Sequence, residues 1–386
     1  MKKKRIVFSL FSVALAFTLV GFRFDFFEIA KQLEIYNTLF KEINMSYVDK
    51  TNPAELMENS VDHMLSNLDP YTIYSSEQDV ENAKIYRSGL YVGIGATMKI
   101  IDKKLIIDEP LKGFSVDKAG LKSGDEITKI NGILLSESFG QAEMLLKGKK
   151  NSKVNITYKR GLKETEVELI RGEKKPKAVP LYKLLDNQIG YIALDRFSRT
   201  SAQEVKSALK FLLIDEAKGL ILDLRNNPGG LLQEAIKIVN LFVKKDQLVV
   251  STRSNIEQYN NQFFTQKQPI SEDIPLVVLV NEKSASASEI VAGALQDLDR
   301  AVIVGKRSFG KGLVQQPKPL PYGAQIKVTI SRYFIPSGRC IQAINYGERS
   351  STGEAKKIEE KKAFKTKKGR IVYDGGGINP DVIIGN

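Results

Sequence analysis

Apolar residues recur at helical spacing in the first part of the chain, after residue 25. A repeat of three to four residues marks one face of an amphipathic helix. The apolar positions are Ile35, Tyr36, Leu39, Phe40 and Ile43, followed by Leu56, Val61, Met64, Leu65 and Leu68. The pattern predicts a helical region over residues 25–86, broken by the string NLDPY at 67–71.

Residues 87–172 show short alternations of apolar and polar residues between glycines, as strands and tight turns do. They predict strands at 96–100, 105–108, 154–159 and 164–170 and a short helix near 141–146. With the strings AGLKSGDEI and ING, this stretch resembles a PDZ domain, an α+β module with a small, partly open barrel. The resemblance implies that backbone N–H groups of Val92, Gly93, Ile94 and Gly95 bind the carboxylate of a peptide C-terminus.

After a linker that contains lysine and proline, apolar strands alternate with helices. The predicted strands are 189–194, 219–224, 275–280, 301–304 and 325–334, and the predicted helices are 202–213, 231–242 and 288–298. Continuous apolar strands between helices are typical of a sheet that is buried on both faces. We expect an α/β core over residues 173–345, and a C-terminal segment over 346–386 that carries a basic loop and returns to the core.

The amino terminus has the pattern of an export signal. Four basic residues, Lys2 to Arg5, precede an uncharged apolar run over residues 6–22. Such a pattern is typical of a secretory signal peptide, and the run approaches the length of a membrane-spanning helix. We expect residues 1–24 to be a signal peptide or an uncleaved anchor in the cytoplasmic membrane. In both cases the rest of the protein lies on the extracytoplasmic (periplasmic) side.

The residue counts exclude several kinds of catalytic and metal site. Of 386 residues, 42% are hydrophobic and 27% charged, the balance of a soluble globular protein. The single cysteine, Cys340, excludes an intramolecular disulfide and a cysteine-based zinc site. The single histidine, His63, has no nucleophile nearby in sequence, and we interpret it as a structural or surface residue. Catalytic triads and metal sites built on histidine are therefore nearly excluded.

The net charge of +13 does not indicate a nucleic-acid partner. Ten of these charges come from Lys2 to Arg5 and from residues 356–370, and the rest of the chain carries +3. We interpret the second cluster as a solvated hairpin or loop. Contact with an anionic membrane surface is the alternative.

Two strand-turn-helix junctions carry residues suited to acyl transfer. The first runs from a strand end at Asp223 to Gly229 and Gly230, where the lack of a side chain permits a sharp turn with free N–H groups. The second runs from Val280 through a turn of serines and alanines that contains Ser286. A serine there can lie at the positive end of the next helix, with the following N–H aimed at a developing oxyanion. A plain N-cap is the alternative.

A lysine between two glycines is a candidate base. The string GKRSFGKG at 305–312 is close to a phosphate-binding loop, but Gly312 replaces the magnesium-binding hydroxyl and the prolines that follow exclude the required helix. An NTPase is therefore rejected. Lys311 can act as a general base for Ser286, since burial can lower the pKa of a lysine from about 10.4 toward 7–8. If the chain is extended there, Gln315 lies on the same face as Lys311 and can orient the neutral amine.

These residues match a known family. The chain resembles the carboxyl-terminal processing (tail-specific) serine proteases from about residue 40 to the C-terminus. The strings that carry the resemblance are SNLDPYT, LDLRNNPGG, SASASEIVAGALQD, GKRSFGKGLVQ, YFIPSGRCIQ and GGGINPDV. By this resemblance Ser286 is the nucleophile, Lys311 is its general base and Gln315 supports Lys311.

The resemblance has further implications. The oxyanion donors would be the backbone N–H groups of Ala287 and of Gly229 or Gly230. The core would be a crotonase-like α/β fold with an inserted PDZ domain and an N-terminal helical region, and no cofactor or metal is expected. The chain would be an endopeptidase that cleaves extracytoplasmic proteins recognised through free C-termini. An adaptor or regulatory protein and self-association into a homo-oligomer are compatible with it. His63 and Tyr71 depart from the residues common in relatives.

Two other functions compete with this one. A PDZ scaffold or adaptor with a degenerate protease core is disfavoured by the intact set of Ser286, Lys311 and Gln315. An acyl-CoA enzyme of the crotonase fold is disfavoured by the PDZ insert and the export signal.

Overall fold

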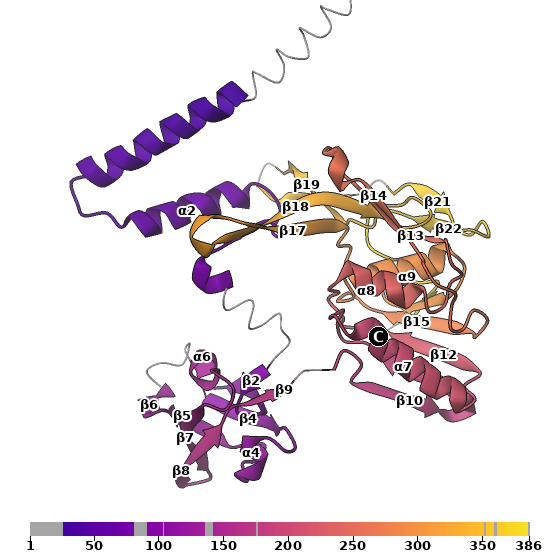
Figure 1. Ribbon diagram of the computed structural model, residues 1–386, viewed down its shortest axis with the longest axis horizontal. Coiled ribbons are helices and arrows are strands. Elements are labelled where there is room, and N and C mark those ends of the chain that lie inside the picture. Colours follow the sequence, from indigo (N-terminus) through magenta and orange to yellow (C-terminus); the bar gives the residue numbers. More distant parts are fainter. Residues whose placement is uncertain are drawn as a thin grey trace, which may run out of the picture. The chain divides into compact units, whose positions relative to one another are not determined.

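The computed structural model describes residues 26–80, 91–102, 104–135, 142–174, 177–350, 353–358 and 361–384. The chain divides into two compact units, Met1–Pro70 and Tyr71–Asn386, and Figure 1 labels many of their elements. The signal or anchor predicted over residues 1–24 lies outside the described residues. Within the ranges above, no helix has both the length and the apolar character needed to cross a membrane.

The described part of the first unit, residues 26–70, contains a helix over 26–46 and α2 (Pro53–Ser66). Helix α2 begins where the side chain of Asn52 accepts hydrogen bonds from two first-turn N–H groups, and Pro53 at the first position needs no partner. None of the residues of α2 is buried. His63 is exposed in its last turn, as expected for a surface residue.

The stretch that resembles a PDZ domain has a hydrophobic core of its own. Its main sheet has the strand order β3-β4-β5-β7-β8, with β6 beside β5, and β2 pairs with β9. The described strands thus form an open path and no closed barrel. The bounds are β2 (Tyr91–Gly93), β3 (Ala96–Ile101), β4 (Lys104–Pro110), α4 (Ser115–Lys118), β5 (Glu126–Ile130), β6 (Ile133–Leu134), α6 (Ala142–Leu146), β7 (Lys153–Arg160), β8 (Lys163–Ile170) and β9 (Gly172–Lys174).

The largest core belongs to a six-stranded sheet of order β10-β11-β12-β15-β16-β23. Strand β10 is antiparallel to β11, and all the other neighbours are parallel. The bounds are β10 (Leu181–Leu185), β11 (Ile189–Ala193), β12 (Gly219–Asp223), β15 (Leu276–Val280), β16 (Val302–Gly305) and β23 (Val382–Ile383), with the helices α7 (Ser201–Ile214), α8 (Leu232–Val239) and α9 (Ala287–Asp297) and the 3-10 turn η2 (Asp186–Gln188). The alternation of strands and helices predicted from the sequence is confirmed.

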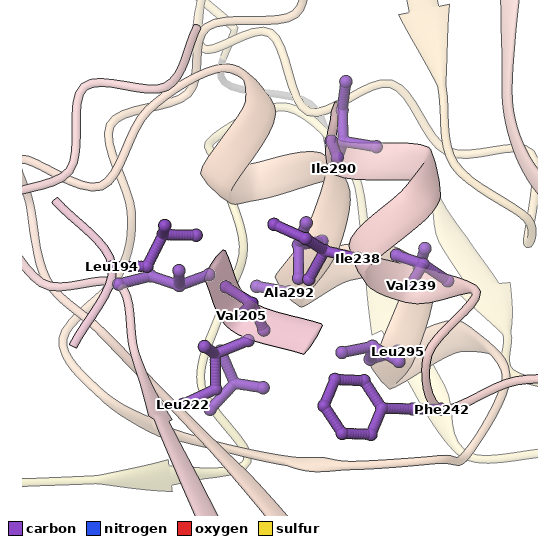
Figure 2. Close-up of a cluster of buried hydrophobic side chains, with 14 of the residues drawn as sticks. Leu194, Val205, Leu222, Ile238, Val239, Phe242, Ile290, Ala292 and Leu295 are labelled. Carbon is purple, nitrogen blue, oxygen red and sulfur yellow. The ribbon is translucent and has the colours of Figure 1, made fainter. Parts of the chain in front are cut away.

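The helices pack on one face of this sheet. Figure 2 shows Leu222 of β12 in a cluster with side chains of α7, α8 and α9. Leu222 and Val278 are fully buried on this face, whereas Ile221 and Val277 on the opposite face are only half-buried. The prediction of a sheet buried on both faces is therefore wrong, because the three helices cover a single face.

A second sheet has the order β1-β18-β13-β14, with β17 paired to β18, and α9 packs against both β16 and β13. The bounds are β1 (Ile73–Ser75), β13 (Leu248–Arg253), η3 (Glu257–Tyr259), β14 (Asn261–Phe264), β17 (Leu313–Pro319), η4 (Pro321–Gly323) and β18 (Gln325–Phe334). The helical prediction is wrong at β1, where Ile73 pairs with Lys327 of β18. A β-branched and aromatic pair directly after the NLDPY break fits an edge strand better than a helix.

The C-terminal segment forms two hairpins and then adds β23 beside β16. The strands of the hairpins are β19 (Ile344–Arg349), β20 (Ala355–Lys357), β21 (Ala363–Lys365) and β22 (Ile371–Tyr373). The lysines described within residues 356–370 are exposed, which agrees with a solvated hairpin.

Candidate active site

The three loops that carry the predicted residues follow neighbouring parallel strands. Strand β12 ends at Asp223, β15 at Val280 and β16 at Gly305, and each strand pairs with the next. The carboxyl ends of parallel strands meet at one edge of the sheet, which is where open α/β sheets bind ligands. Segments that lie up to about 90 residues apart in sequence are thereby brought to one place.

Hydrogen bonds join the first loop to the second. The main-chain carbonyl of Asn227 accepts hydrogen bonds from the Ala285 N–H at 3.0 Å and from the Ser288 hydroxyl at 2.9 Å. The Ser284 hydroxyl donates to the Leu224 carbonyl at 2.7 Å. The turn that contains Ser286 is therefore fixed on both sides to the loop of the two glycines.

Ser286 is half-buried and caps the N-terminus of α9. Its φ of +56° and ψ of −113° lie in a region that costs a non-glycine residue about 1–3 kcal/mol. Gly229 approaches this turn closely, since a methyl group at Gly229 would lie 2.6 Å from the Ala285 oxygen and 2.9 Å from the Ser286 Cβ. Any side chain at this position would clash with the turn. This clash explains why the first residue of the pair is glycine.

The predicted oxyanion donors differ in their surroundings. Ala287 is the first residue of α9, where an N–H has no acceptor within the helix. The Gly229 N–H donates to the side-chain oxygen of the buried Asn227 at 2.9 Å. Gly230 is exposed, with a φ of +145°. Of the two glycines, Gly229 thus already has an acceptor within the loop.

Glu289 connects the second loop to the third. Its fully buried carboxylate accepts hydrogen bonds from the Ser286 N–H at 2.8 Å and the Lys311 N–H at 2.9 Å on one oxygen. The other oxygen accepts from the Ser308 hydroxyl at 2.6 Å and the Gly310 N–H at 2.7 Å. One side chain thereby fixes the main chain on both sides of the site.

Burial raises the pKa of the Glu289 carboxyl above its ordinary value, and the four hydrogen bonds oppose that shift. Every one of these bonds points its hydrogen at a carboxylate oxygen, which is the arrangement that an ionised acid requires. The site therefore contains a buried acidic group that depends on four donors from two segments.

Lys311 is half-buried next to two tyrosines. Its Nζ lies 3.9 Å from the centre of the Tyr71 ring. A cation over an aromatic face is attracted by the ring, so this contact favours the protonated lysine. The main-chain carbonyl of Lys311 accepts a hydrogen bond from the Tyr333 hydroxyl. Glu289, which accepts hydrogen bonds from the main-chain N–H groups of both Ser286 and Lys311, brings these two residues together in one site.

Gln315 lies in β17, and its side-chain amide donates to the Thr329 hydroxyl at 3.2 Å. Strand β17 begins at Leu313, and its register against β18 shifts between Val314 and Gln315, where Ile330 of β18 is the extra residue. The bulge therefore interrupts the alternation of side chains in β18 and not in β17. The expected common face of Lys311 and Gln315 stays a prediction.

The predicted carboxylate loop of the PDZ domain spans the end of β2 and the turn before β3. Val92 and Gly93 belong to β2, Ile94 is fully buried, and Gly95 has a φ of +88° with the Phe114 side chain packed against it. Strand β3 ends the order of the main PDZ sheet, so among the described strands it is an edge. An edge strand beside this loop is the geometry that peptide-strand addition requires.

Several residues of the site were missed in the sequence. Glu289 stands three residues after Ser286, the spacing of a capping box, so a signal for it was present. Asn227, Tyr71 and Tyr333 gave no local signal, because their roles depend on contacts across the sheet.

The peptidase family S41 model matches residues 188–347, and the PDZ domain model matches residues 92–170. The probable CtpA-like serine protease of Staphylococcus haemolyticus (strain JCSC1435) is 36% identical over 304 residues, which are 78% of this chain and 61% of that protein. Residues 188–347 are therefore a peptidase family S41 domain, and residues 92–170 are a PDZ domain. The S41 match includes Ser286, Lys311 and Glu289, and the PDZ match includes the predicted carboxylate loop.

Other S41 relatives give similar values. The probable CtpA-like serine protease of Staphylococcus aureus (strain MRSA252) is 33% identical over 305 residues, again 78% of this chain and 61% of the relative. The chain thus spans about three fifths of the length of these curated relatives. Among solved structures, the photosystem II D1 C-terminal processing protease aligns at 25% identity over 89% of this chain and 91% of that one, with a TM-score of 0.49.

The role of Glu289 leads to a prediction that is independent of activity. In Glu289→Gln, one carboxylate oxygen, which accepts two hydrogen bonds, is replaced by an amide NH2 group. This group is a donor and would face two other donors. We expect the free energy of unfolding to fall by about 2–4 kcal/mol, because hydrogen bonds to a charged group are lost. Amide hydrogen exchange at Gly310 and Lys311 should become at least about tenfold faster, as measured by NMR or mass spectrometry.

Glu234→Gln is the matched control. Glu234 is also buried and accepts a hydrogen bond from the Ala202 N–H at 2.9 Å, on a different helix. It should lower stability without changing exchange at Gly310 and Lys311. Unchanged exchange at these amides in Glu289→Gln would contradict the proposed connection.

Proposed function

We propose that this chain is a serine endopeptidase that cleaves extracytoplasmic proteins recognised through their C-termini, with Ser286 as nucleophile and Lys311 as general base. The observation that carries the proposal is that Glu289 accepts hydrogen bonds from the main-chain N–H groups of both residues. This shared acceptor supports a site in which the two side chains act together. The match of residues 188–347 to peptidase family S41 supports the same chemistry.

In the proposed reaction, the Ser286 Oγ attacks the scissile carbonyl while its proton moves to the neutral Lys311 amine. The N–H of Ala287, at the positive end of α9, stabilises the oxyanion. Gly230 is the favoured second donor, because the Gly229 N–H is already hydrogen-bonded to Asn227. The protonated Lys311 then donates its proton to the leaving amine, and water hydrolyses the acyl-enzyme.

The contact with Tyr71 affects the protonation state of Lys311, the proposed base. Because the ring favours the ammonium form of Lys311, catalysis requires that the lysine lose a proton. The side-chain amide of Gln315 donates a hydrogen bond to the Thr329 hydroxyl. To support Lys311 as proposed, the amide must break this hydrogen bond or form a second one.

The catalytic prediction concerns two alanine variants. Ser286→Ala and Lys311→Ala should each reduce cleavage of an unfolded test protein by about a thousandfold or more, since each removes an essential group. The rate of the wild-type protein should rise with pH as the lysine amine deprotonates. Cleavage is measured by gel and by a fluorogenic peptide, and folding by circular dichroism.

Lys306→Ala is the matched control, because Lys306 is exposed in the same loop as Lys311. It should keep the wild-type rate. Full activity of Lys311→Ala together with an inactive His63→Ala would refute the assignment. A PDZ adaptor without peptidase activity would give no cleavage by the wild type at all.

The PDZ domain is the proposed site of substrate recognition. The substrate C-terminus would add as a strand to the edge of β3, with its carboxylate on the N–H groups between Val92 and Gly95. A main-chain site of this kind reads the carboxylate itself, so unfolded proteins with a free C-terminus are the expected substrate class.

We predict that a peptide substrate with a free C-terminal acid is cleaved at least about tenfold faster than the same peptide with a C-terminal amide at low concentration, because the amide lacks the charge that the loop would bind. The matched control is a pair of peptides too short to reach the PDZ domain, for which acid and amide should be cleaved equally. Equal rates for the long pair would exclude carboxylate recognition.

The location is a proposal from the sequence pattern of residues 1–24. We predict that protease added to spheroplasts degrades the body of the protein, because the body lies outside the cytoplasmic membrane. A cytoplasmic enzyme serves as the control for membrane integrity. A body that is protected in spheroplasts and degraded only after lysis would show that this location is wrong.

A further inference from the structure

The ring of Tyr71 lies against the side chain of the proposed base. The Lys311 Nζ is 3.9 Å from the centre of this ring, well inside the distance of about 6 Å within which an aromatic face attracts a cation. Tyr71 stands just before β1 and Lys311 just before β17, and both strands pair with β18. The mechanism above requires Lys311 as a neutral amine and gives Tyr71 no task.

The Tyr71 ring is held by contacts on its own side of the site. The hydroxyl of the next residue, Thr72, is buried and accepts a hydrogen bond from the Thr329 N–H at 3.1 Å. The Tyr71 ring meets the Tyr346 ring at 89°, with the ring centres 6.1 Å apart, which is a favourable edge-to-face arrangement. The ring therefore has a defined place, independent of the lysine.

The main chain of Lys311 is held by other segments. Its N–H donates to Glu289 at 2.9 Å, and its carbonyl accepts from the Tyr333 hydroxyl. The N–H of the next residue, Gly312, donates to the buried side chain of Gln342 at 2.7 Å. Because other contacts fix the main chain next to both partners, the contact of ring and amine orders little that is not already ordered. Since Lys311 is half-buried, water also weakens this attraction less than on an open surface.

We propose that Tyr71 is a positioning residue that holds the Lys311 ammonium against its ring and thereby raises the pH at which the peptidase becomes active. This inference rests on the proposed function, in which the amine must be neutral. Before the attack the ammonium releases one proton to water, and the amine then accepts the proton of the Ser286 Oγ. The ring attracts the ammonium and not the neutral amine, so it opposes the first of these steps.

Other charged and titratable groups surround this pair. Burial raises the pKa of Tyr333 well above its ordinary value, so this phenol stays protonated. The Glu289 carboxylate, which accepts the Lys311 N–H, favours a nearby ammonium as the ring does. The groups on the neighbouring elements are Glu289, Tyr333, Tyr346, Cys340 and Arg332, which pairs with Leu313. All of them are kept in the variants below, so a changed pH profile reports on the ring.

The test compares the pH profile of cleavage in the wild type and in Tyr71→Leu, which removes the ring and keeps an apolar side chain. We expect the rise of kcat/KM with pH to begin about 0.5–1 pH unit lower in the variant, because the ammonium loses the attraction of the ring. On this rising part of the profile, the variant should cleave a fluorogenic peptide about 3–10-fold faster than the wild type. Loss of a residue that only supported the fold would lower the rate and leave the profile in place.

Tyr71→Phe and Tyr74→Leu are the matched controls. The first keeps an aromatic face, and the second makes the same replacement in β1, where Tyr74 pairs with Ile326. In both, the rise should begin within about 0.2 pH unit of that of the wild type, since the ring against Lys311 is retained. A folded Tyr71→Leu variant whose profile coincides with that of the wild type would overturn the proposal.

If Tyr71→Leu does not fold, replacement of Tyr71 by phenylalanine with one, two or three ring fluorines provides the test. Fluorine withdraws electrons from the ring face and changes the size of the ring little. The attraction for a cation therefore falls stepwise, while the packing against Tyr346 is kept. The rise of the profile should move to lower pH with each added fluorine. A profile that does not depend on the number of fluorines would refute the role of the ring.

A direct titration of Lys311 separates this inference from the proposed function. In Ser286→Ala, with and without Tyr71→Leu, acetylation of Lys311 by acetic anhydride is followed against pH by mass spectrometry. Loss of the ring should move this pH dependence about 0.5–1 pH unit lower, and an unmoved dependence would overturn this inference alone. A wild-type protein that cleaves no peptide at any pH would remove the proposed function, whereas the shift in acetylation would still be seen.

Discussion

The site depends on one buried carboxylate that needs donors from two segments. An ionised acid removed from water is destabilised by several kcal/mol unless its oxygens are hydrogen-bonded. Glu289 meets this requirement with main-chain and hydroxyl donors only, from the turn of Ser286 and from the loop that follows β16. Because the donors lie on two separate loops, the carboxylate is stable only when both loops are in place. The same bonds that satisfy Glu289 therefore set the geometry of the active site.

This requirement also explains how a strained serine persists. The φ of Ser286 is unfavourable for a residue with a side chain, yet its N–H has an ionic acceptor in Glu289 and its neighbour Ala285 is bonded to Asn227. Gly229 also packs closely against this turn, since a Cβ at position 229 would lie 2.8 Å from the Ala287 nitrogen. Strain of this kind persists where the surrounding contacts over-determine the backbone.

Much of the fold could be predicted from the sequence, because the parallel strands are apolar and the helices between them are amphipathic. Strand β18 has the predicted bounds, and α9 differs from its prediction by one residue at each end. The half-buried face of the sheet could not be predicted, since Ile221 and Val277 are as apolar as the residues on the buried face. Strand β1 was also missed, because its partner β18 lies about 250 residues further along the chain.

For the site, the sequence singled out the loops whose residues lie in local strings, while the roles of those residues stay predictions. Ser286, Lys311 and the two glycines belong to recognisable motifs, and the sheet brings their loops together. Tyr333 and Tyr71 could not be found, because a tyrosine in a strand or after a proline carries no signal of its distant neighbour. Gln315 also belongs to a recognisable string, but its hydrogen bond to Thr329 of β18 could not be predicted, because it depends on the pairing of two strands.

The distribution of the site along the chain has a consequence for biosynthesis. The contacts around Ser286 join Tyr71, Asn227, Glu289, Lys311 and Tyr333, and β16, which leads to the lysine loop, has β23 as its outer neighbour. A chain that is still being synthesised therefore lacks the partners that create the site until its last third has emerged and folded. Assembly of the site is for this reason a late event, coupled to folding of the C-terminal third of the chain.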